Sequence, residues 1–346
     1  MFCVVSVLLA LAQPVVLRAQ QAAGLFDSQE ILDLQLEYDL KKFSNDRGTS
    51  RGYHPAKLTY ITPGGKPVTL DVRIMVRGNM RRQMLDCLVP MFKIEFEKSQ
   101  TPQTIFENQE SLKVVAHCKN KPDFYRYYTF QEYLVYKIYN ILTGLSFRVR
   151  LARVAYNDTR KDIKSFTAYG FFIESYEQMV RRNLAKTVEV TTITYPQLDF
   201  ETSTLVSVFE YMIGSTDWSM LAGHNIKLLT IGDNPVYFPV PYDFDQVGLI
   251  DAHYARPDLS LPIRSVRERL FRGYCKSEAQ FNRTFEVFRK HKEEVIALYR
   301  DFAFLPDKIK KRSIKYLEEF YDIIANPKLV KRYFIDNYRG RPLPNY

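Results

Sequence analysis

The chain has 346 residues and a formal net charge of +10, with 46% hydrophobic and 14% aromatic residues. This composition excludes an intrinsically disordered protein, because it supplies ample material for a large packed core. The basic excess favours anionic partners, but the basic residues are scattered among acidic ones without an aromatic reader motif, so we expect no nucleic-acid partner.

An apolar run at residues 1–12, broken at Pro14, opens the chain. It is too short to span a bilayer and is typical of a secretory signal, although no Lys or Arg precedes it. We therefore expect residues 1–22 to be a signal peptide, cleaved between Ala19 and Ala23; a buried N-terminal helix is the alternative. The mature protein would be exported, periplasmic or extracellular, and would carry no integral membrane segment.

Three cysteines would remain after cleavage: Cys87, Cys118 and Cys275. In an oxidising compartment they allow at most one disulfide and a free thiol, and the sequence alone does not fix the pair. We favour Cys87–Cys118 because both lie in the N-terminal part. Apart from the adjacent His117-Cys118, no cysteine has a second ligand at zinc spacing, so we expect no zinc site.

The first half of the chain is rich in strand patterns. Residues 27–45 fit a short helix or a strand equally well, whereas residues 57–62 and 68–76 flank a Pro-Gly-Gly turn and predict a hairpin. Apolar alternation or short apolar runs predict further strands at residues 91–97, 112–116, 149–156 and 167–174.

Helical patterns dominate the second half. We expect an aromatic-rich helix at 123–142, a helix ending near residue 212 and leading to Gly214, and helical structure from Glu278 to about Ile324. The prolines of residues 237–241 favour an extended segment.

No Ser/Gly/Pro-rich linker separates the two halves. We therefore predict one composite α+β domain over 23–346, with a single core. Its β-rich N-terminal lobe would cover about 50–200, and its helical C-terminal lobe about 201–346.

The polar stretch from Asp217 to Asp245 concentrates the side chains that could carry chemistry. Asp217 and Asn225 flank a short loop before an apolar strand, and a second strand leads into Asp243-Phe244-Asp245. Such a unit can place Asp217, Asn225 and Asp243 at one end of a hairpin. Phosphoryl transfer needs one carboxylate for the hydroxyl proton, and an amide and a carboxylate for Mg²⁺. The alternative is that these residues only cap turns and satisfy backbone donors.

Two neighbours of this stretch have less specific interpretations. His224 could be a base or a metal ligand, but a lone histidine beside an asparagine is more often a packing or hydrogen-bonding residue. Trp218, the only tryptophan, is more often a core residue than a substrate platform.

This stretch resembles the C-terminal half of the CotH kinase family, which comprises exported or spore-coat atypical kinases. That family carries an Asp, an Asn and a late Asp-x-Asp in this order. Upstream, Val76-Arg77-Gly78-Asn79, then Arg81-Arg82 and the strand with Lys93, resemble its Arg-Gly-Asn segment and lysine-bearing strand. The segment Tyr169–Glu174 resembles its Gly-x-Tyr-x-x-x-Glu motif. The resemblance covers about residues 70–251, and the chain would be a divergent member.

The resemblance implies a two-lobed, atypical protein-kinase-like fold and an ATP- and Mg²⁺- (or Mn²⁺-) dependent kinase acting on an exported or envelope protein. It also implies the following roles: Asp217 as catalytic carboxylate, Asn225 and Asp243 as metal ligands with Asp245 assisting, Arg77 and Lys93 at the nucleotide phosphates, and Glu174 as a lysine partner or nucleotide contact.

Two features depart from the protein-kinase pattern. Asn225 follows Asp217 by eight positions instead of five, and Trp218-Ser219 replaces the usual Arg or His after the Asp. A catalytically inactive, kinase-like envelope protein with a binding or structural role is therefore the alternative. A metal-dependent hydrolase using Asp243 and Asp245 is a third, weaker hypothesis.

Overall fold

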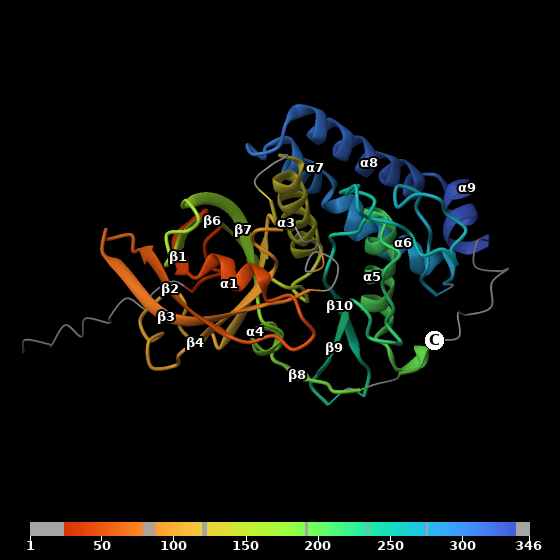
Figure 1. The fold of residues 1–346 in the computed structure, drawn as a ribbon. Coiled ribbons are helices and arrows are strands. Elements are labelled where there is room, and N and C mark those ends of the chain that lie inside the picture. Colours follow the sequence, from red (N-terminus) through yellow and green to blue (C-terminus); the bar gives the residue numbers. More distant parts are fainter. Residues whose placement is uncertain are drawn as a thin grey trace, which may run out of the picture.

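The structure is a computed structural model that describes residues 24–78, 83, 87–119, 123–190, 193–233, 235–274 and 276–336. The expected signal peptide (1–22), Asn79, Arg81-Arg82 and Cys275 lie outside the described residues. Strands dominate the first half of the chain and helices the second (Figure 1), which confirms the mixed α and β architecture and its order.

Seven strands of the N-terminal half form a closed barrel in the order β1-β2-β3-β4-β5-β7-β6. They are β1 (Leu32–Tyr38), β2 (His54–Ile61), β3 (Pro67–Val76), β4 (Phe92–Phe96), β5 (Ser111–Ala116), β6 (Val149–Asp158) and β7 (Phe166–Ile173). Every neighbouring pair is antiparallel except β1 and β6, which run parallel and close the barrel.

The closed barrel differs from the expected protein-kinase-like first lobe. The difference arises at β1, which lies in the segment that fitted a helix or a strand equally well. Its residues alternate between buried and exposed along the whole strand, and it pairs with both β2 and β6. Strand β1 also starts the barrel upstream of the boundary expected near residue 50.

The predicted hairpin is confirmed by β2 and β3, which pair from His54↔Ile74 to Ile61↔Pro67. Gly65 occupies the turn with φ +78°, a left-handed conformation that glycine adopts without a side-chain penalty. The strands predicted at 91–97, 112–116, 149–156 and 167–174 are also confirmed, as β4, β5, β6 and β7.

The helices that follow the sequence patterns are α3 (Phe124–Leu142), α5 (Phe200–Ile213), α6 (Glu278–Lys290), α7 (Lys292–Arg300) and α8 (Asp307–Ala325). The shorter elements are α1 (Leu40–Asn45), α4 (Tyr176–Arg182), α9 (Pro327–Val330), η1 (Tyr195–Gln197) and the π-helical turn η2 (Lys331–Asp336). A second, antiparallel sheet has the order β10-β9-β8, with β8 (Ala185–Thr187), β9 (Ile226–Ile231) and β10 (Phe238–Pro241).

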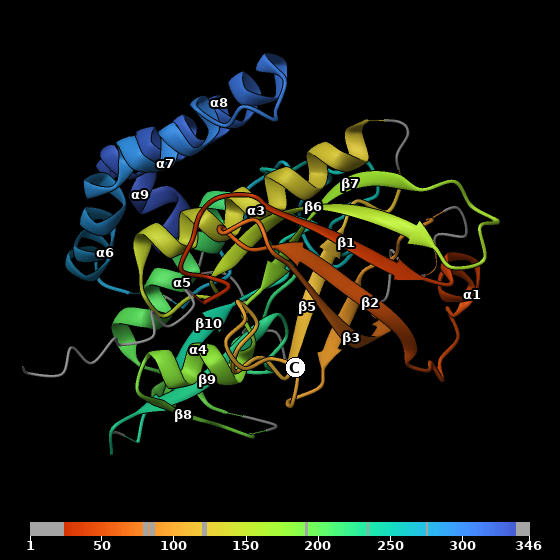
Figure 2. The same ribbon diagram turned by 90° about the vertical axis from the view of Figure 1, so that its left-hand side faces the viewer.

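Two large hydrophobic clusters replace the single core that we expected. One fills the barrel, and the other lies between the outer face of β6 and β7 and the helices. The adjacent residues Phe171 and Phe172 show why: successive strand side chains point to opposite faces, so Phe171 joins the helical cluster and Phe172 the barrel interior. Helix α3 accordingly runs along β6 and β7 (Figure 2).

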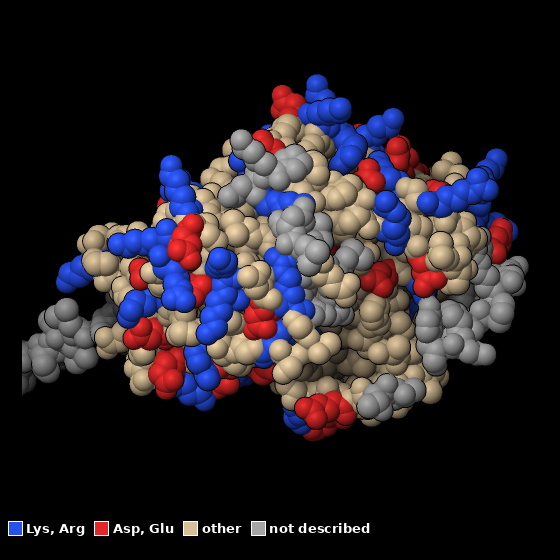
Figure 3. Space-filling view, in the orientation of Figure 1, with Lys and Arg blue, Asp and Glu red and all other residues tan. Residues whose placement is uncertain are grey.

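The predicted disulfide between Cys87 and Cys118 is present, with the two Cα atoms 4.7 Å apart. Both cysteines are buried beside Tyr125 of α3. Within the described part of the chain, none of the helices has the length and apolar character needed to cross a membrane. On the face shown in Figure 3, basic and acidic side chains are interspersed over the barrel and the helices.

Candidate functional site

A cavity of about 280 Å³ lies where the outer wall of the barrel meets α3, α4 and the β9–β10 hairpin. Four of the seven predicted site residues line it: Arg77, Lys93, Glu174 and Asp243. Two further lysines, Lys113 and Lys227, line it as well. The structure thus gathers residues that are more than 160 positions apart in the sequence.

The barrel register brings the cationic side chains together. Lys93 of β4 lies directly opposite Lys113 of β5, and both stand on the outer face because their neighbours Ile94 and Leu112 point into the barrel core. Arg77 follows β3, where its backbone N–H donates to the Met91 carbonyl at 2.8 Å. Like charges directly opposite on neighbouring strands are destabilising, so an anion bound between these lysines would stabilise the pair.

The β9–β10 hairpin contributes the other wall. Lys227 lies on β9, and Asp243 follows β10 with φ +68°. The Tyr242 backbone N–H donates to the Asn225 carbonyl at 3.0 Å, so Asn225 and the Tyr242–Asp243 pair lie at the same end of the hairpin. The Tyr242 ring lies 5.1 Å from Lys113 Nζ and 5.9 Å from Lys227 Nζ, within reach of a cation–π interaction.

Asp217 reaches the same end of the hairpin through a short loop after α5. Helix α5 ends at Gly214, which has φ +71° as the helix cap. The loop closes through mutual backbone hydrogen bonds between Ser219 and His224, at 2.9 and 3.0 Å. Asn225 Nδ2 donates to the Asp217 carbonyl at 2.7 Å and to its Oδ2 at 3.2 Å.

These contacts confirm that Asp217, Asn225 and Asp243 share one end of a hairpin. His224 Nε2 lies 2.8 Å from Asp217 Oδ1, so the histidine is a hydrogen-bonding neighbour of this carboxylate. Trp218 is buried in the helical cluster, as the core interpretation predicts.

Three predicted residues are not among the described residues that line the cavity: Asp217, Asn225 and Asp245. Asp217 is exposed on the loop surface, and Asn225 is half-buried beside it. Asp245 is only 8% exposed, so its side chain is largely withdrawn from solvent. The cavity and the Asp217 loop are therefore neighbours, joined by Asn225 and Tyr242.

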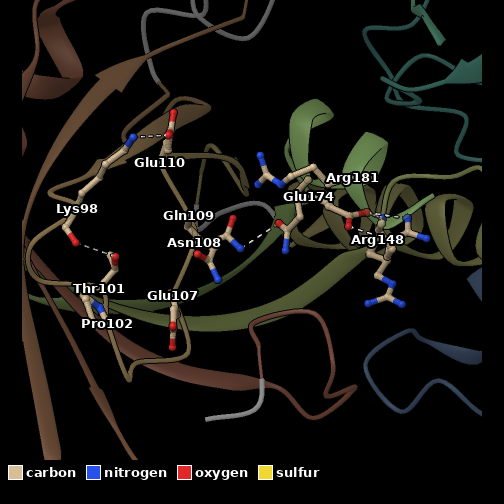
Figure 4. A pocket seen from close by; sticks show the side chains of 12 residues that line it. Lys98, Thr101, Pro102, Glu107, Asn108, Gln109, Glu110, Arg148, Glu174 and Arg181 are labelled. Carbon is tan, nitrogen blue, oxygen red and sulfur yellow. Dashed lines mark hydrogen bonds and ion pairs between the residues drawn. The ribbon is translucent and has the colours of Figure 1, made fainter. Parts of the chain in front are cut away.

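Glu174 has a structural partner that the sequence did not reveal. Its carboxylate accepts two hydrogen bonds from Arg182, at 3.0 and 2.9 Å, and a third from the Arg148 backbone N–H at 3.0 Å. The ion-pair partner of Glu174 is thus an arginine of α4, and not Lys93. Glu174 also borders a second, open cavity of about 810 Å³, in which Gln109 donates to Gln178 at 2.9 Å (Figure 4).

The described residues that line the first cavity include four cations and three carboxylates (Glu174, Glu177 and Asp243), and one of these carboxylates, Glu174, is already paired with Arg182 outside this set. Lys113 reaches solvent through the cavity but is surrounded by protein atoms; desolvation, followed by repulsion from Arg77 and Lys227, lowers its pKa to about 8. Arg77 Nε is buried and has no hydrogen-bond partner within the described part of the chain. No described carboxylate forms an ion pair with Arg77, Lys93, Lys113 or Lys227. The site is therefore suited to an anionic ligand.

A buried carboxyl group lies close to the Asp217 loop. Glu210, in the last turn of α5, is 2% exposed, and its Oε2 has no hydrogen-bond partner among the described residues. Desolvation raises its pKa to about 8; a hydrogen bond with Ser215 opposes this rise, and the charge of Asp217 adds to it.

The oxygen atoms of Asn225 and Asp243 match the ligands that Mg²⁺ prefers, and Mg²⁺ usually takes only one or two carboxylates together with substrate phosphates. No group of three or more His, Cys, Asp and Glu side chains that could hold a metal ion is found within the described residues. A metal at Asn225 and Asp243 would therefore need further oxygen ligands, such as those of a phosphate group.

Sequence reasoning missed Lys113, Lys227 and Tyr136 as cavity residues. The two lysines carry a weak signal, because each interrupts an otherwise apolar strand. Tyr136 carries none, since it is one of many aromatic residues of α3.

Comparisons with known proteins give similarity in structure. No protein-family model matches the chain, and no curated protein matches it. Among solved structures, the Helicobacter pylori proinflammatory kinase CtkA matches with 13% sequence identity and a TM-score of 0.36, over 71% of this chain and 89% of that chain.

Proposed function

We propose that the protein is an atypical kinase that transfers the terminal phosphoryl group of ATP, with Mg²⁺, to an exported or envelope protein. The observation that carries the proposal is the cavity in which Arg77, Lys93, Lys113 and Lys227 converge, with the carboxylate of Asp243 among its other lining groups. Phosphoryl transfer depends mainly on positioning and on neutralising the phosphate charge, and this arrangement supplies both.

The four cations are the phosphate-binding groups in this proposal. Lys93 and Lys113 repel each other across β4 and β5, and a bound phosphate chain relieves that repulsion. Arg77 Nε, buried without a partner among the described residues, gains a charged acceptor at the same time. Glu174 is already paired with Arg182, so Asp243 and Glu177 are the lining carboxylates that offset part of this positive charge.

Asp217 is the carboxylate that takes the proton. The acceptor hydroxyl oxygen bonds to the terminal phosphorus, its proton passes to Asp217, and the bond from that phosphorus to the bridging oxygen breaks to release ADP. The hydrogen bonds from Asn225, together with the contact to His224, hold the Asp217 side chain in one orientation for this transfer.

Asn225 and Asp243 would hold the metal, with Asp245 assisting as the CotH kinase resemblance implies. Bound Mg²⁺ would neutralise part of the phosphate charge. Export rests on the N-terminal apolar run, and the excess of basic residues is compatible with an acidic acceptor protein.

Three substitutions test this proposal. Asp217→Asn should keep ATP·Mg²⁺ binding but lower phosphoryl transfer by about a hundredfold or more, the contribution of a positioned general base. Asp243→Asn should abolish Mg²⁺-dependent nucleotide binding. Asp233→Asn, at the exposed opposite end of the same hairpin, is the matched control and should change neither.

Binding is measured by calorimetry, and transfer by radiolabel incorporation into the protein itself and into an acidic protein. Wild-type protein that binds ATP·Mg²⁺ without transferring phosphate would favour the inactive, kinase-like binding protein. Equal behaviour of all three variants would contradict the assigned roles.

A further inference from the structure

Tyr136 occupies a position in the cavity that its role in packing does not explain. It lies on α3, is 2% exposed and lines the cavity. Its ring packs against Phe171 and Phe244, with centroid distances of 5.7 and 4.7 Å. Its hydroxyl oxygen accepts a hydrogen bond from the Asp243 backbone N–H at 2.9 Å.

This hydrogen bond holds a strained residue. Asp243 has φ +68°, a left-handed conformation that costs a non-glycine residue free energy unless its surroundings enforce it. Two neighbouring contacts enforce it: Tyr242 donates to Asn225 on one side, and Asp243 donates to Tyr136 on the other. Strained backbone is frequent at functional sites. The contact from α3 therefore fixes Asp243, which is a metal ligand in the proposed function.

The hydroxyl group of Tyr136 has a further capacity. A phenol oxygen that accepts an N–H still carries its own proton, and none of the described residues accepts that proton. A buried donor without an acceptor is costly, and a phosphate oxygen in the cavity would provide the acceptor.

We propose that Tyr136 holds Asp243 in its working conformation and that its hydroxyl group donates a hydrogen bond to an oxygen of the phosphate chain bound in the cavity. This inference rests on the proposed function, because it assigns a ligand contact and a positioning role to the same site. The ligand class is the phosphate chain of a nucleotide, and inorganic pyrophosphate represents that chain alone.

The test compares two Tyr→Phe changes on one helix. Tyr136→Phe removes the hydroxyl but keeps the ring packing. Tyr139→Phe is the matched control, because Tyr139 is also fully buried on α3 but its hydroxyl has no partner among the described residues. Binding of ATP·Mg²⁺ and of inorganic pyrophosphate is measured by calorimetry, and unfolding by thermal melting without ligand.

Tyr136→Phe should lower the affinity for both ligands about tenfold or more, the usual effect of losing a hydrogen bond to a charged group. Tyr139→Phe should bind within about twofold of wild type, and both variants should melt within a few degrees of it. If wild type binds and Tyr136→Phe binds equally well, the inference is wrong while the proposed function stands. If wild type binds neither ligand, the proposed function itself fails.

A double-mutant cycle with Asp243→Glu, which keeps a carboxylate for the metal and so a measurable affinity, separates the two roles and uses pyrophosphate with Mg²⁺ as the probe. If the double variant loses less affinity than the product of the two single-variant losses, Tyr136 acts through Asp243. Strictly multiplicative losses would overturn the positioning role. The comparison remains valid if Tyr136→Phe lowers the melting temperature, because binding is measured under conditions where all four proteins are folded.

Discussion

The buried carboxyl group of Glu210 should make the stability of the protein depend on pH. Its pKa rises from an ordinary 4.5 to about 8 in the folded chain, mainly through desolvation. Between these values the folded protein keeps a proton that the unfolded chain has lost, so the free energy of unfolding falls as pH rises from about 4.5 to about 8. The full difference corresponds to about 5 kcal/mol, of which about 3 kcal/mol is lost by pH 7.

The substitution Glu210→Gln removes this ionisation and keeps the shape of the side chain. The free energy of unfolding of the variant should therefore exceed that of wild type increasingly from pH 5 to pH 8. Chemical denaturation at four pH values in this range measures the difference. Glu201→Gln is the control, because Glu201 lies exposed in the first turn of the same helix.

Subtracting the Glu210→Gln curve from the wild-type curve removes all other groups that titrate in this range. Parallel curves for wild type and Glu210→Gln would refute the reasoning, and so would an equal effect of Glu201→Gln.

Two further predictions concern the frame of the site. Arg182→Met should lower the free energy of unfolding by about 3–5 kcal/mol, because it leaves the carboxylate of Glu174 buried without its charge partner. Glu174→Gln made in the same background should restore part of this loss. A denaturation series that finds no recovery would contradict this prediction. Gly214→Ala should lower the melting temperature markedly, because its Cβ would lie 2.2 Å from the Tyr316 hydroxyl at a backbone φ of +71°; an unchanged melting curve would show that the cap tolerates a side chain.

Local patterns were sufficient to predict most elements of the barrel. Apolar alternation marks β4, and the Pro-Gly-Gly turn marks the β2–β3 hairpin, because strand periodicity and turn chemistry are properties of short segments. The closure of the barrel was not predictable in this way. It depends on the parallel pairing of β1 with β6, more than 110 residues apart in the chain, and no local pattern encodes that contact.

The candidate site was likewise predictable only where its residues lie close together in the sequence. Asp217, Asn225 and Asp243 were expected at one hairpin end because they flank two consecutive strands, and the hydrogen bonds of Asn225 bear this out. Lys113 and Lys227 could not be assigned to the cavity, since only the packing of the barrel against the second sheet brings β5 and β9 together. Arg182 was likewise hidden, because its pairing with Glu174 requires the fold of α4 against the end of β7.

The proposed function requires that the cavity lined by Arg77, Lys93, Lys113 and Lys227 binds the phosphates of a nucleotide. The most direct measurement is a calorimetric titration of ATP·Mg²⁺ into wild type, Lys113→Met and Lys164→Met, the last being an exposed lysine in the β6–β7 loop that serves as the control. Wild type and Lys164→Met should bind with the same affinity, whereas Lys113→Met should bind about tenfold more weakly or worse, as expected when a charge-assisted contact is removed. No heat of binding in the wild-type protein, or equal affinity in all three, would contradict this requirement.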